Sequence, residues 1–316
     1  MNHQDYSIRD FIDGDEESQA FIFNQVMKDI EPGISLLSAE NIKTIQARVP
    51  IFSHGHIKFL ICPNGKISGY GECRGYVDTN YLDYPLILKE HRSDETLNML
   101  FEAIYAFSKS KYPGVAIATH SYLERYTQVH DFFQNQNIAK INRIQIAVQY
   151  TIPVESLNFE TPDYDLKPFT KDDIEKLIEF RYSNNNNIIG DGISAKSLSR
   201  GFSSGRYSPE KTFFVYQNEN LIGWTSVSIH TPINEAQSRR AIKHPIAVPG
   251  GYIRRLDHED RLGLEKAMFK ASYKYLKKKN ITEYRVFVIS TSPFIELCDE
   301  IGLKPTGERE ISYIFT

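Results

Sequence analysis

Residues 252–269 read YIRRLDHEDRLGLEKAMF, and this stretch decides the fold. An apolar, arginine-containing strand candidate passes through a charged loop with one glycine, Gly263, and enters a long amphipathic helix. The start of a helix presents unpaired N–H groups and the positive end of the helix dipole, so a loop with little side-chain bulk can hold a pyrophosphate there. We interpret the stretch as an altered phosphate-binding loop, with an ordinary strand–loop–helix turn as the alternative.

The helix after this loop has a regular apolar stripe. Its apolar residues recur at steps of three and four, at Leu264, Ala267, Met268, Ala271 and Tyr275. Lysines gather near its far end, where cations suit the C-terminus of a helix. Strand, loop and helix are therefore the predicted order.

The composition is that of an ordinary globular protein. The 316 residues, 41% hydrophobic and 24% charged, suggest two domains or one large domain. A formal net charge of −3 provides no overall basic field for nucleic acid or for an anionic membrane surface. We therefore expect neither as a partner, and the sequence leaves the oligomeric state open.

Neither a membrane segment nor an export signal is visible in the sequence. No apolar run approaches the length needed to cross a bilayer, and the start MNHQDYSIRD lacks the basic-then-apolar order of a secretory signal. The three cysteines, Cys62, Cys73 and Cys298, are widely spaced without a CxxC motif. This spacing fits reduced thiols and argues against a disulfide framework or a structural zinc site. The expected location is cytoplasmic, and no metal site is expected.

Blocks of sequence recur in the same order in two halves of the chain. The first block, 6–11, matches 164–169 at a distance of 158 positions. The second, 59–70, matches 213–224 at a distance of 154 positions, and each copy reads as a strand, a polar turn and a second strand. The later blocks are the helices 100–105 and 268–273, the strands 115–118 and 284–289, the short helices 129–136 and 294–301, and the closing strands 144–148 and 311–315.

This repetition predicts a duplication. The predicted domains are 1–152 and 164–316, joined by a linker at 153–163 in which Pro153 and Pro162 bracket a polar stretch. Each half reads as strand, helices, hairpin, strand, helix, strand, helix, strand. The predicted fold class is therefore α+β, with about 150 residues in each unit.

The order of elements resembles the GCN5-related N-acetyltransferase (GNAT) superfamily, here as a tandem pair. The most specific local piece is 292–305, SPFIELCDEIGLKP, which is similar to the family pattern N-x-x-A-x-x-L-Y-E-K-L-G-F-K-P. The resemblance implies two acyl-CoA N-acyltransferase-like domains, each a mixed, mostly antiparallel sheet flanked by helices. It also implies acetyl-CoA, or another acyl-CoA, as donor and a primary amine as the usual acceptor.

The phosphate loop of the family reads (Gln or Arg)-x-x-Gly-x-(Gly or Ala), and this chain departs from it. With Gly263 as the first glycine, Asp260 stands at the basic position and Glu265 at the small one, and both disfavour an anion. A loop one residue shorter would instead give the basic role to Arg261. The resemblance implies a pantetheine arm along 252–256 and the cofactor-binding residues Leu256, Arg261, Leu262, Gly263, Leu264 and Lys266.

The catalytic candidates follow the same strand. An amine must be neutral to attack a thioester, so a base or a water relay is needed near the end of 252–256. By position, Glu259 is the first candidate, His258 the second, and a solvated charge cluster is the alternative. Cys298 stands where the family has a tyrosine that can protonate the leaving thiolate, although simple packing is the commoner role of such a cysteine.

The N-terminal half departs further from the family. Its equivalent loop, 91–96, has no glycine and contains Asp94 and Glu95, while Phe133 takes the tyrosine position. We expect this half to bind no coenzyme A.

The predicted function is transfer of an acetyl group from acetyl-CoA to a primary amine of a small molecule. A non-catalytic acyl-CoA-binding or ligand-binding module is the first alternative, and the altered positions Asp260, Glu265 and Cys298 would be its signature. A tRNA-dependent aminoacyl transferase is the second alternative, which the lack of a basic stripe disfavours.

Overall fold

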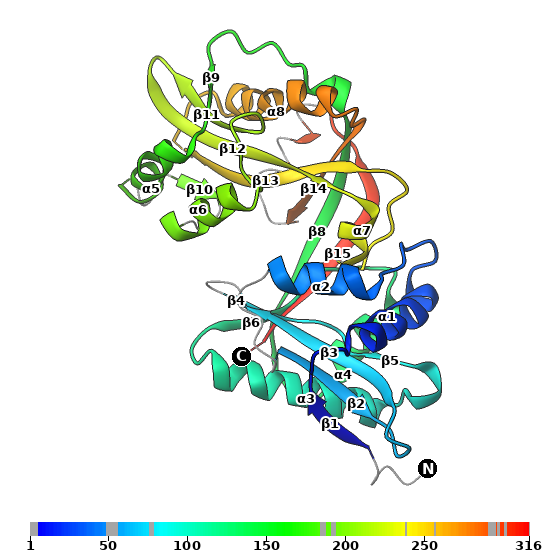
Figure 1. Ribbon diagram of the computed structural model, residues 1–316. Helices are drawn as coiled ribbons and strands as arrows, with labels where there is room; N and C mark the ends of the chain where they lie inside the picture. Colours follow the sequence, from blue (N-terminus) through cyan, green and yellow to red (C-terminus); the bar gives the residue numbers. More distant parts are fainter. Residues whose placement is uncertain are drawn as a thin grey trace. The chain divides into compact units, whose positions relative to one another are not determined.

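The chain forms two compact units, each built from more than one segment (Figure 1). The computed structural model describes residues 6–48, 56–75, 79–183, 188–190, 194–237, 239–255, 257–289, 295, 298–299 and 302–315. Unit 1 comprises residues 1–147, 232–243 and 308–316, and unit 2 comprises residues 148–231 and 244–307. Unit 1 therefore contains two segments that lie, in sequence, within the predicted C-terminal half.

Unit 1 is a sheet with helices on both faces. Its elements are β1 (Ser7–Asp10), α1 (Glu16–Ile30), α2 (Ala39–Arg48), β2 (Ile57–Ile61), β3 (Ile67–Gly75), β4 (Thr79–Leu82), β5 (Leu86–Ile87), η3 (Lys89–His91), α3 (Asp94–Lys111), β6 (Ala116–Thr119), β7 (Tyr122–Leu123), α4 (Thr127–Asn135), the first part of β8 (Ile141–Pro153), α7 (Pro232–Gln237) and the end of β15 (Pro305–Phe315). The strand order is β1-β2-β3-β4-β6-β15, with β4 and β6 parallel and the other neighbours antiparallel. Figure 1 shows α1 and α2 on one face of this sheet and α3 on the other.

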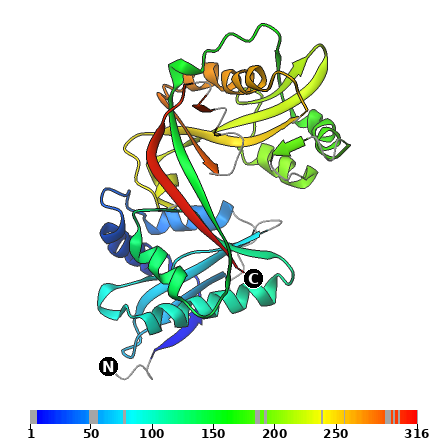
Figure 2. The same cartoon turned by 180° about the vertical axis from the view of Figure 1, so that it is seen from behind.

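An aromatic cluster fills the core of unit 1 on the side of α3 and α4. Figure 2 shows the backbone of these helices, in teal and green, and of β15, in red. Phe101 and Phe133 come from these helices, and the end of β15 adds Tyr313 and Phe315. The ring centroids of Phe133 and Tyr313 are 5.3 Å apart, and those of Phe101 and Phe315 are 5.9 Å apart. Such edge-on and tilted aromatic pairs stabilise a core beyond the apolar area that they bury. The end of β15 is therefore an integral part of unit 1.

The segment 232–243 is also built into unit 1. Ala236 is fully buried in the core, and Arg239 is only 4% exposed. Arg239 Nη1 donates a hydrogen bond to the carbonyl of Tyr84 at 2.7 Å, and the Tyr126 hydroxyl donates to the carbonyl of Arg239 at 2.9 Å. Arg239 Nη2 lies 3.8 Å from Asp83 Oδ2, so its charge faces a carboxylate. These contacts fix the segment by buried polar groups as well as by apolar packing.

Unit 2 has the same kind of architecture. Its elements are the remainder of β8, η4 (Val154–Leu157), β9 (Asp165–Pro168), η5 (Lys171–Asp173), α5 (Ile174–Ser183), β10 (Ile188–Gly190), α6 (Ala195–Ser203), β11 (Thr212–Gln217), β12 (Asn220–His230), β13 (Ile246–Arg255), α8 (Arg261–Lys278), β14 (Glu283–Ile289) and the start of β15. The strand order is β8-β14-β13-β12-β11-β9, in which β13 and β14 are parallel and β9, β11, β12 and β13 pair antiparallel. Each unit is thus α+β with a mixed, mostly antiparallel sheet, which confirms the predicted fold class.

Alternation along the strands gives the sheet of unit 2 two apolar faces. Phe214 of β11 and Trp224 of β12 belong to the core beneath α5 and α6. Val215 and Ile222, on the opposite face, pack against the stripe of α8 that begins with Leu264. Figure 1 shows α8 on the opposite side of the sheet from α5 and α6. The predicted amphipathic helix is confirmed, because its stripe is the buried face of α8.

The two predicted hairpins are confirmed, and they occupy the same place in each unit. In unit 1, β2 and β3 pair antiparallel around a turn in which Gly65 has φ +80°. In unit 2, β11 and β12 pair around Asn218 and Glu219, whose φ values are +47° and +65°. Two consecutive positive φ values match the twist of the flanking strands, which is why short hairpin turns favour this conformation.

The stretch 153–163, predicted as a linker, contains the short helix η4. Val154 and Leu157 of this helix are buried in the core of unit 2. The backbone N–H of Val154 donates to the carbonyl of Thr282 at 2.9 Å. At least the first part of this stretch is therefore packed structure.

No helix in the described part of the chain is long and apolar enough to span a bilayer. The described ranges also contain no group of three or more His, Cys, Asp or Glu side chains placed to hold a metal ion.

Candidate functional site

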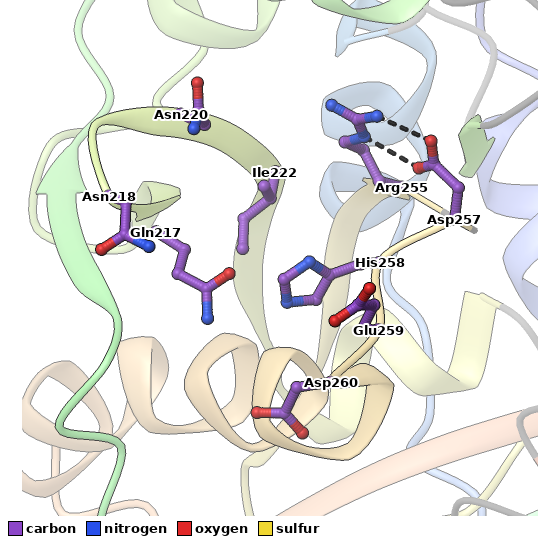
Figure 3. Close-up of a pocket in the computed structure, with 9 residues that line it drawn as sticks. All are labelled: Gln217, Asn218, Asn220, Ile222, Arg255, Asp257, His258, Glu259 and Asp260. Carbon is purple, nitrogen blue, oxygen red and sulfur yellow. Dashed lines mark hydrogen bonds and ion pairs between the residues drawn. The ribbon is translucent and has the colours of Figure 1, made fainter.

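A polar pocket of about 330 Å³ lies in unit 2 at the end of β13, where the chain turns toward α8 (Figure 3). Two segments form it, the turn between β11 and β12 and the loop 257–260 before α8. Its lining side chains are Gln217, Asn218, Asn220, Ile222, Arg255, Asp257, His258, Glu259 and Asp260. The predicted bases Glu259 and His258 thus lie in one pocket, next to amide side chains from the hairpin turn that sequence reasoning did not include.

The pocket is acidic. Its lining places three carboxylates against a single guanidinium, that of Arg255. Arg255 is already paired with Asp257, with Nε to Oδ1 at 2.8 Å and Nη2 to Oδ2 at 2.7 Å. This bidentate contact holds the pKa of the Asp257 carboxyl below its usual range. Glu259 is exposed and makes no hydrogen bond or ion pair with any described residue, so the pocket favours a cationic ligand.

His258 is hydrogen-bonded to Tyr164, a residue that is distant from it in sequence. The Tyr164 hydroxyl lies 3.0 Å from His258 Nε2 and 2.7 Å from Asp260 Oδ2. The rings of Tyr164 and His258 meet edge to face, with centroids 6.0 Å apart. Burial, followed by the hydrogen bond to Asp260, raises the pKa of Tyr164, and the same hydrogen bond lowers the pKa of Asp260. The result is a neutral phenol between an imidazole and a charged carboxylate.

Asp260 also caps α8. Its Oδ1 accepts the backbone N–H of Gly263 at 2.8 Å. A Cβ placed on Gly263 would overlap the Asp260 carboxylate, so the absence of a side chain at 263 makes room for this cap. The glycine that was predicted to admit a phosphate instead admits the chain's own carboxylate.

Glu265, at the position predicted to be small in a phosphate loop, points into unit 2. Its Oε1 lies 2.6 Å from Arg254 Nε, and both side chains are almost fully buried. The pair joins β13 to α8 beneath the loop, because Arg254 is the penultimate residue of β13 and Glu265 lies in the second turn of α8. A buried carboxylate of this kind needs its partner charge to remain ionised.

The other predicted cofactor-binding residues are dispersed around the start of α8. Arg261 is exposed, Leu262 and Lys266 are partly exposed, and Leu264 is buried in the core against Ile222. Leu256 lies outside the described residues. Of these residues, the described ones do not line the pocket.

Cys298 is fully buried in the core of unit 2 and does not line the pocket. Burial raises the pKa of its thiol to about 12, so it is a weak acid in this environment.

A pyrophosphate does not fit the start of α8 in this arrangement. The N–H of Gly263 is already hydrogen-bonded to Asp260, and a bound phosphate would lie beside that negative charge. The residues present therefore do not match the phosphate contacts that the GNAT resemblance implies.

Unit 1 has a second polar cavity, of about 510 Å³, between the start of α3 and the length of α4 with the residues that follow it. Arg92, Asp94 and Asp131 line it together with several amide side chains. The start of α3 is closed by a capping box, in which Ser93 Oγ accepts the Thr96 N–H at 3.2 Å. That unit 1 binds no coenzyme A remains a prediction.

Tyr164 is a further residue of the site that the sequence did not predict, since it lies 94 positions before His258. The repeat contained a usable signal, because Tyr164 matches Tyr6 in the first block. In unit 1, the Tyr6 hydroxyl lies 2.9 Å from His91 Nδ1, and His91 precedes α3 as His258 precedes α8. A tyrosine–histidine pair therefore lies before the corresponding helix in both units, and in unit 2 the carboxylate of Asp260 joins it.

Comparison with solved structures supports the architecture. A GCN5-related N-acetyltransferase from Sphaerobacter thermophilus aligns with a TM-score of 0.64 and 11% identity, over 98% of this chain and 95% of that one. A tandem GNAT protein from the clavulanic acid biosynthesis pathway gives 0.61 and 12%, over 98% of both chains. N-myristoyltransferase from Saccharomyces cerevisiae, solved with bound myristoyl-CoA, gives 0.57 and 11%, over 99% of this chain and 83% of that one.

No protein-family model matches this sequence, and no curated protein matches it. At identities near 11%, the similar structures establish the fold. The chain has the fold of the GCN5-related N-acetyltransferases, as a tandem of two units.

Proposed function

We propose that this chain transfers an acyl group from acyl-coenzyme A, with acetyl-CoA as the expected donor, to a primary amine of a small molecule. The pocket of unit 2 carries the proposal, because it combines acidic side chains with two candidate bases at the end of β13. The fold supports it, since similar structures named above are an N-acetyltransferase and an N-myristoyltransferase. That link is an analogy between folds, and the pocket supplies the chemistry.

The acidic lining suits the acceptor. A primary amine is an ammonium ion at neutral pH, and the unpaired carboxylate of Glu259 favours its approach. The ammonium must then lose a proton before it can attack a carbonyl carbon. His258 or Glu259 can accept this proton directly or through one water molecule. The amine is thus attracted as a cation and reacts as a neutral nucleophile.

Coenzyme A would supply an activated thioester. The start of α8 does not fit its pyrophosphate while Asp260 caps the helix. The residues of this chain therefore account for the chemistry of the acceptor amine.

The direct experiment is to measure release of coenzyme A from acetyl-CoA by chromatography across a panel of primary amines. With a reactive amine, His258→Gln or Glu259→Gln should lower kcat by about 10²-fold or more, the usual contribution of a general base. Glu175→Gln, an exposed change of the same type on α5, is the matched control and should leave kcat unchanged. Equal rates in all three variants would contradict the assignment of the base.

A non-catalytic ligand-binding module is the second candidate, and the Asp260 cap favours it. Under this function, an amine raises the melting temperature and acetyl-CoA does not, because only a ligand that binds the folded state stabilises it. A shift with millimolar acetyl-CoA would support the enzyme. No shift together with no turnover would leave the binding module.

A further inference from the structure

We infer that Tyr164 and Asp260 are positioning residues that fix the tautomer of His258, so that Nδ1 is the proton acceptor in the pocket of unit 2. The consequence for rate rests on the proposed acyl transfer, whereas the tautomer itself does not.

The direction of the hydrogen bonds follows from the donors available. Asp260 is ionised, because its pKa is held below the usual range, and a carboxylate only accepts. The Tyr164 hydroxyl has one hydrogen, which it donates to Asp260 Oδ2 at 2.7 Å. The carbonyl of Asp260, 3.1 Å from the hydroxyl, can also only accept, so the phenol oxygen accepts from His258 Nε2 at 3.0 Å. Nε2 must therefore carry the hydrogen, and in a neutral imidazole the lone pair is left on Nδ1.

Tyr164 and Asp260 are each fixed by contacts of their own. Tyr164 is 8% exposed and belongs to the same apolar cluster as Val215 of β11 and Leu264 of α8. The second oxygen of Asp260 is fixed by the N–H of Gly263, and the positive end of the α8 dipole stabilises its charge. His258 Nδ1 has no hydrogen-bond partner among the described residues, and the ring lines the pocket (Figure 3). The free nitrogen is thus available to a ligand, while the other is anchored.

Unit 1 provides an internal comparison. There Tyr6 contacts the Nδ1 atom of His91, and Ser93 stands as the N-cap of α3 where unit 2 has Asp260. A tyrosine–histidine contact alone is therefore a feature that both units share. In unit 2, the carboxylate of Asp260 accepts the hydrogen of the Tyr164 hydroxyl, and this leaves the phenol oxygen to accept the hydrogen on His258 Nε2.

The proton transfer balances simply. An ammonium group R–NH3⁺ gives one proton to Nδ1, which leaves a neutral amine R–NH2 and an imidazolium ring. The N–H bond of the ammonium breaks, the Nδ1–H bond forms, and the proton later passes to water.

The test is the tautomer of His258, read from long-range ¹H–¹⁵N spectra of protein labelled at its nine histidines. The spectra are recorded about two pH units above the reference imidazole pKa of about 6.5, and His258→Gln assigns the signal by its loss. In the native chain, the form with hydrogen on Nε2 should dominate. In Tyr164→Phe, that preference should fall by about fivefold, since one hydrogen bond contributes about 1 kcal/mol.

An unchanged tautomer ratio in Tyr164→Phe would overturn the inference, provided that Trp224 emission shows unit 2 to be folded. Trp224 is the single tryptophan of the chain and is buried in unit 2. Should Tyr164→Phe unfold, Asp260→Asn serves as the second variant, with the same expectation and the same contrary outcome. Tyr6→Phe is the matched control, which should alter the signal of His91 and leave that of His258 unchanged.

A kinetic arm separates this inference from the proposed function. With a reactive amine in hand, Tyr164→Phe should lower kcat by about tenfold and leave the KM for acetyl-CoA unchanged. If no amine is acylated, the proposed function fails, and the spectra still decide the tautomer. If amines are acylated and the tautomer is the same in every variant, the inference alone fails.

Discussion

Asp260 is bound at both carboxylate oxygens, by the backbone of Gly263 and by the hydroxyl of Tyr164. It is therefore both a helix cap and an anchor for a side chain that contacts His258. A carboxylate at a helix start is stabilised by the helix dipole and lends stability to the first turn. Changes at this one residue should thus alter both the stability of unit 2 and the state of the pocket.

Because a Cβ at position 263 would overlap the Asp260 carboxylate, the effect of Gly263→Ala on the stability of unit 2 should depend on whether Asp260 is present. In the native chain, Gly263→Ala must displace the Asp260 carboxylate, so the lost cap, worth about 1 kcal/mol, offsets the better helix propensity of alanine. In an Asp260→Ala background there is no carboxylate to displace. The same Gly263→Ala change should then stabilise unit 2 by about 0.5–1 kcal/mol.

The measurement is urea unfolding followed by the emission of Trp224, which reports on unit 2. An identical effect of Gly263→Ala in both backgrounds would show that the two residues are not coupled.

The buried carboxyl of Glu310 should make the stability of unit 1 depend on pH. Burial raises its pKa to about 7 from a reference of 4.5, although Arg240 Nη2 lies 2.6 Å from its Oε1. The folded state therefore binds more protons than the unfolded state between pH 4.5 and about 7. The contribution of Glu310 to stability is fully present below pH 4.5 and is lost as the pH rises through about 7.

Thermal unfolding of the native chain and of Glu310→Gln, each at pH 5 and pH 8, tests this prediction. The native chain should lose more stability between the two pH values than Glu310→Gln does, by on the order of 3 kcal/mol. Equal losses would show that Glu310 titrates normally in the folded state.

Sequence reasoning found the local part of the site and missed the distant part. His258 and Glu259 follow a recognisable strand and precede a recognisable helix, so their position could be predicted. Tyr164 reaches the site only through the packing of the chain before β9 against α8, which no local pattern encodes. The Asp260 cap was likewise missed, because the same sequence permits either a bound phosphate or a bound carboxylate at a helix start.

At the scale of elements, α8 is attached to the sheet in two ways. Its apolar stripe packs on β11 and β12, and Glu265 forms a buried ion pair with Arg254 of β13. Buried ion pairs often contribute little net stability, whereas removal of one partner leaves an uncompensated charge. The pair should therefore be far more sensitive to a single substitution than to a double one.

Glu265→Ala should lower the free energy of unfolding of unit 2 by about 3–5 kcal/mol, because Arg254 stays buried without its carboxylate. The joint change of Arg254 and Glu265 to Met should cost clearly less. Glu155→Ala removes an exposed partner of Lys277 on the same helix and is the control, which should leave stability nearly unchanged. Urea unfolding monitored by Trp224 emission provides the comparison, and a double variant as unstable as Glu265→Ala would contradict this account.

The elements themselves were largely predictable, because their signals are local. The turn residues Asn64 and Gly65 predicted the hairpin of β2 and β3, and the sequence repeat predicted that of β11 and β12. The pairing of distant strands was not predictable in the same way. The alternating pattern of 311–315 indicates a strand, but alternation does not specify the sheet that the strand joins, and the last two of these residues pair with β6 of unit 1.

At the scale of the whole molecule, unit 1 depends on residues that are distant in sequence. Tyr313 and Phe315 enter its aromatic core, and residues 314 and 315 pair with Ala118 and Ile117 of β6. The first 147 residues alone lack this strand and the buried segment 232–243. Two tandem copies of a fold therefore do not imply two independent stretches of chain.

Phe315→Ala should destabilise unit 1 by about 3–5 kcal/mol, because it empties a site lined by Phe101 and Phe133. Hydrogen exchange of peptides from α3 and α4 should speed up, while peptides from α5 and α6 of unit 2 should not change. Phe21→Ala is the matched control in unit 1, since Phe21 is 54% exposed and should have a small effect. Faster exchange confined to unit 2 would contradict the assignment of this segment.

Because β15 is synthesised long after β6, unit 1 cannot complete its sheet until the end of the chain is made. A ribosome adds about 5–20 residues per second, so some 195 residues of further synthesis, on the order of ten seconds or more, separate β6 from its partner residues in β15. During that interval β6 presents an open edge on the nascent chain, a surface that invites wrong pairing and chaperone binding. Unit 1 begins to emerge first and is completed last.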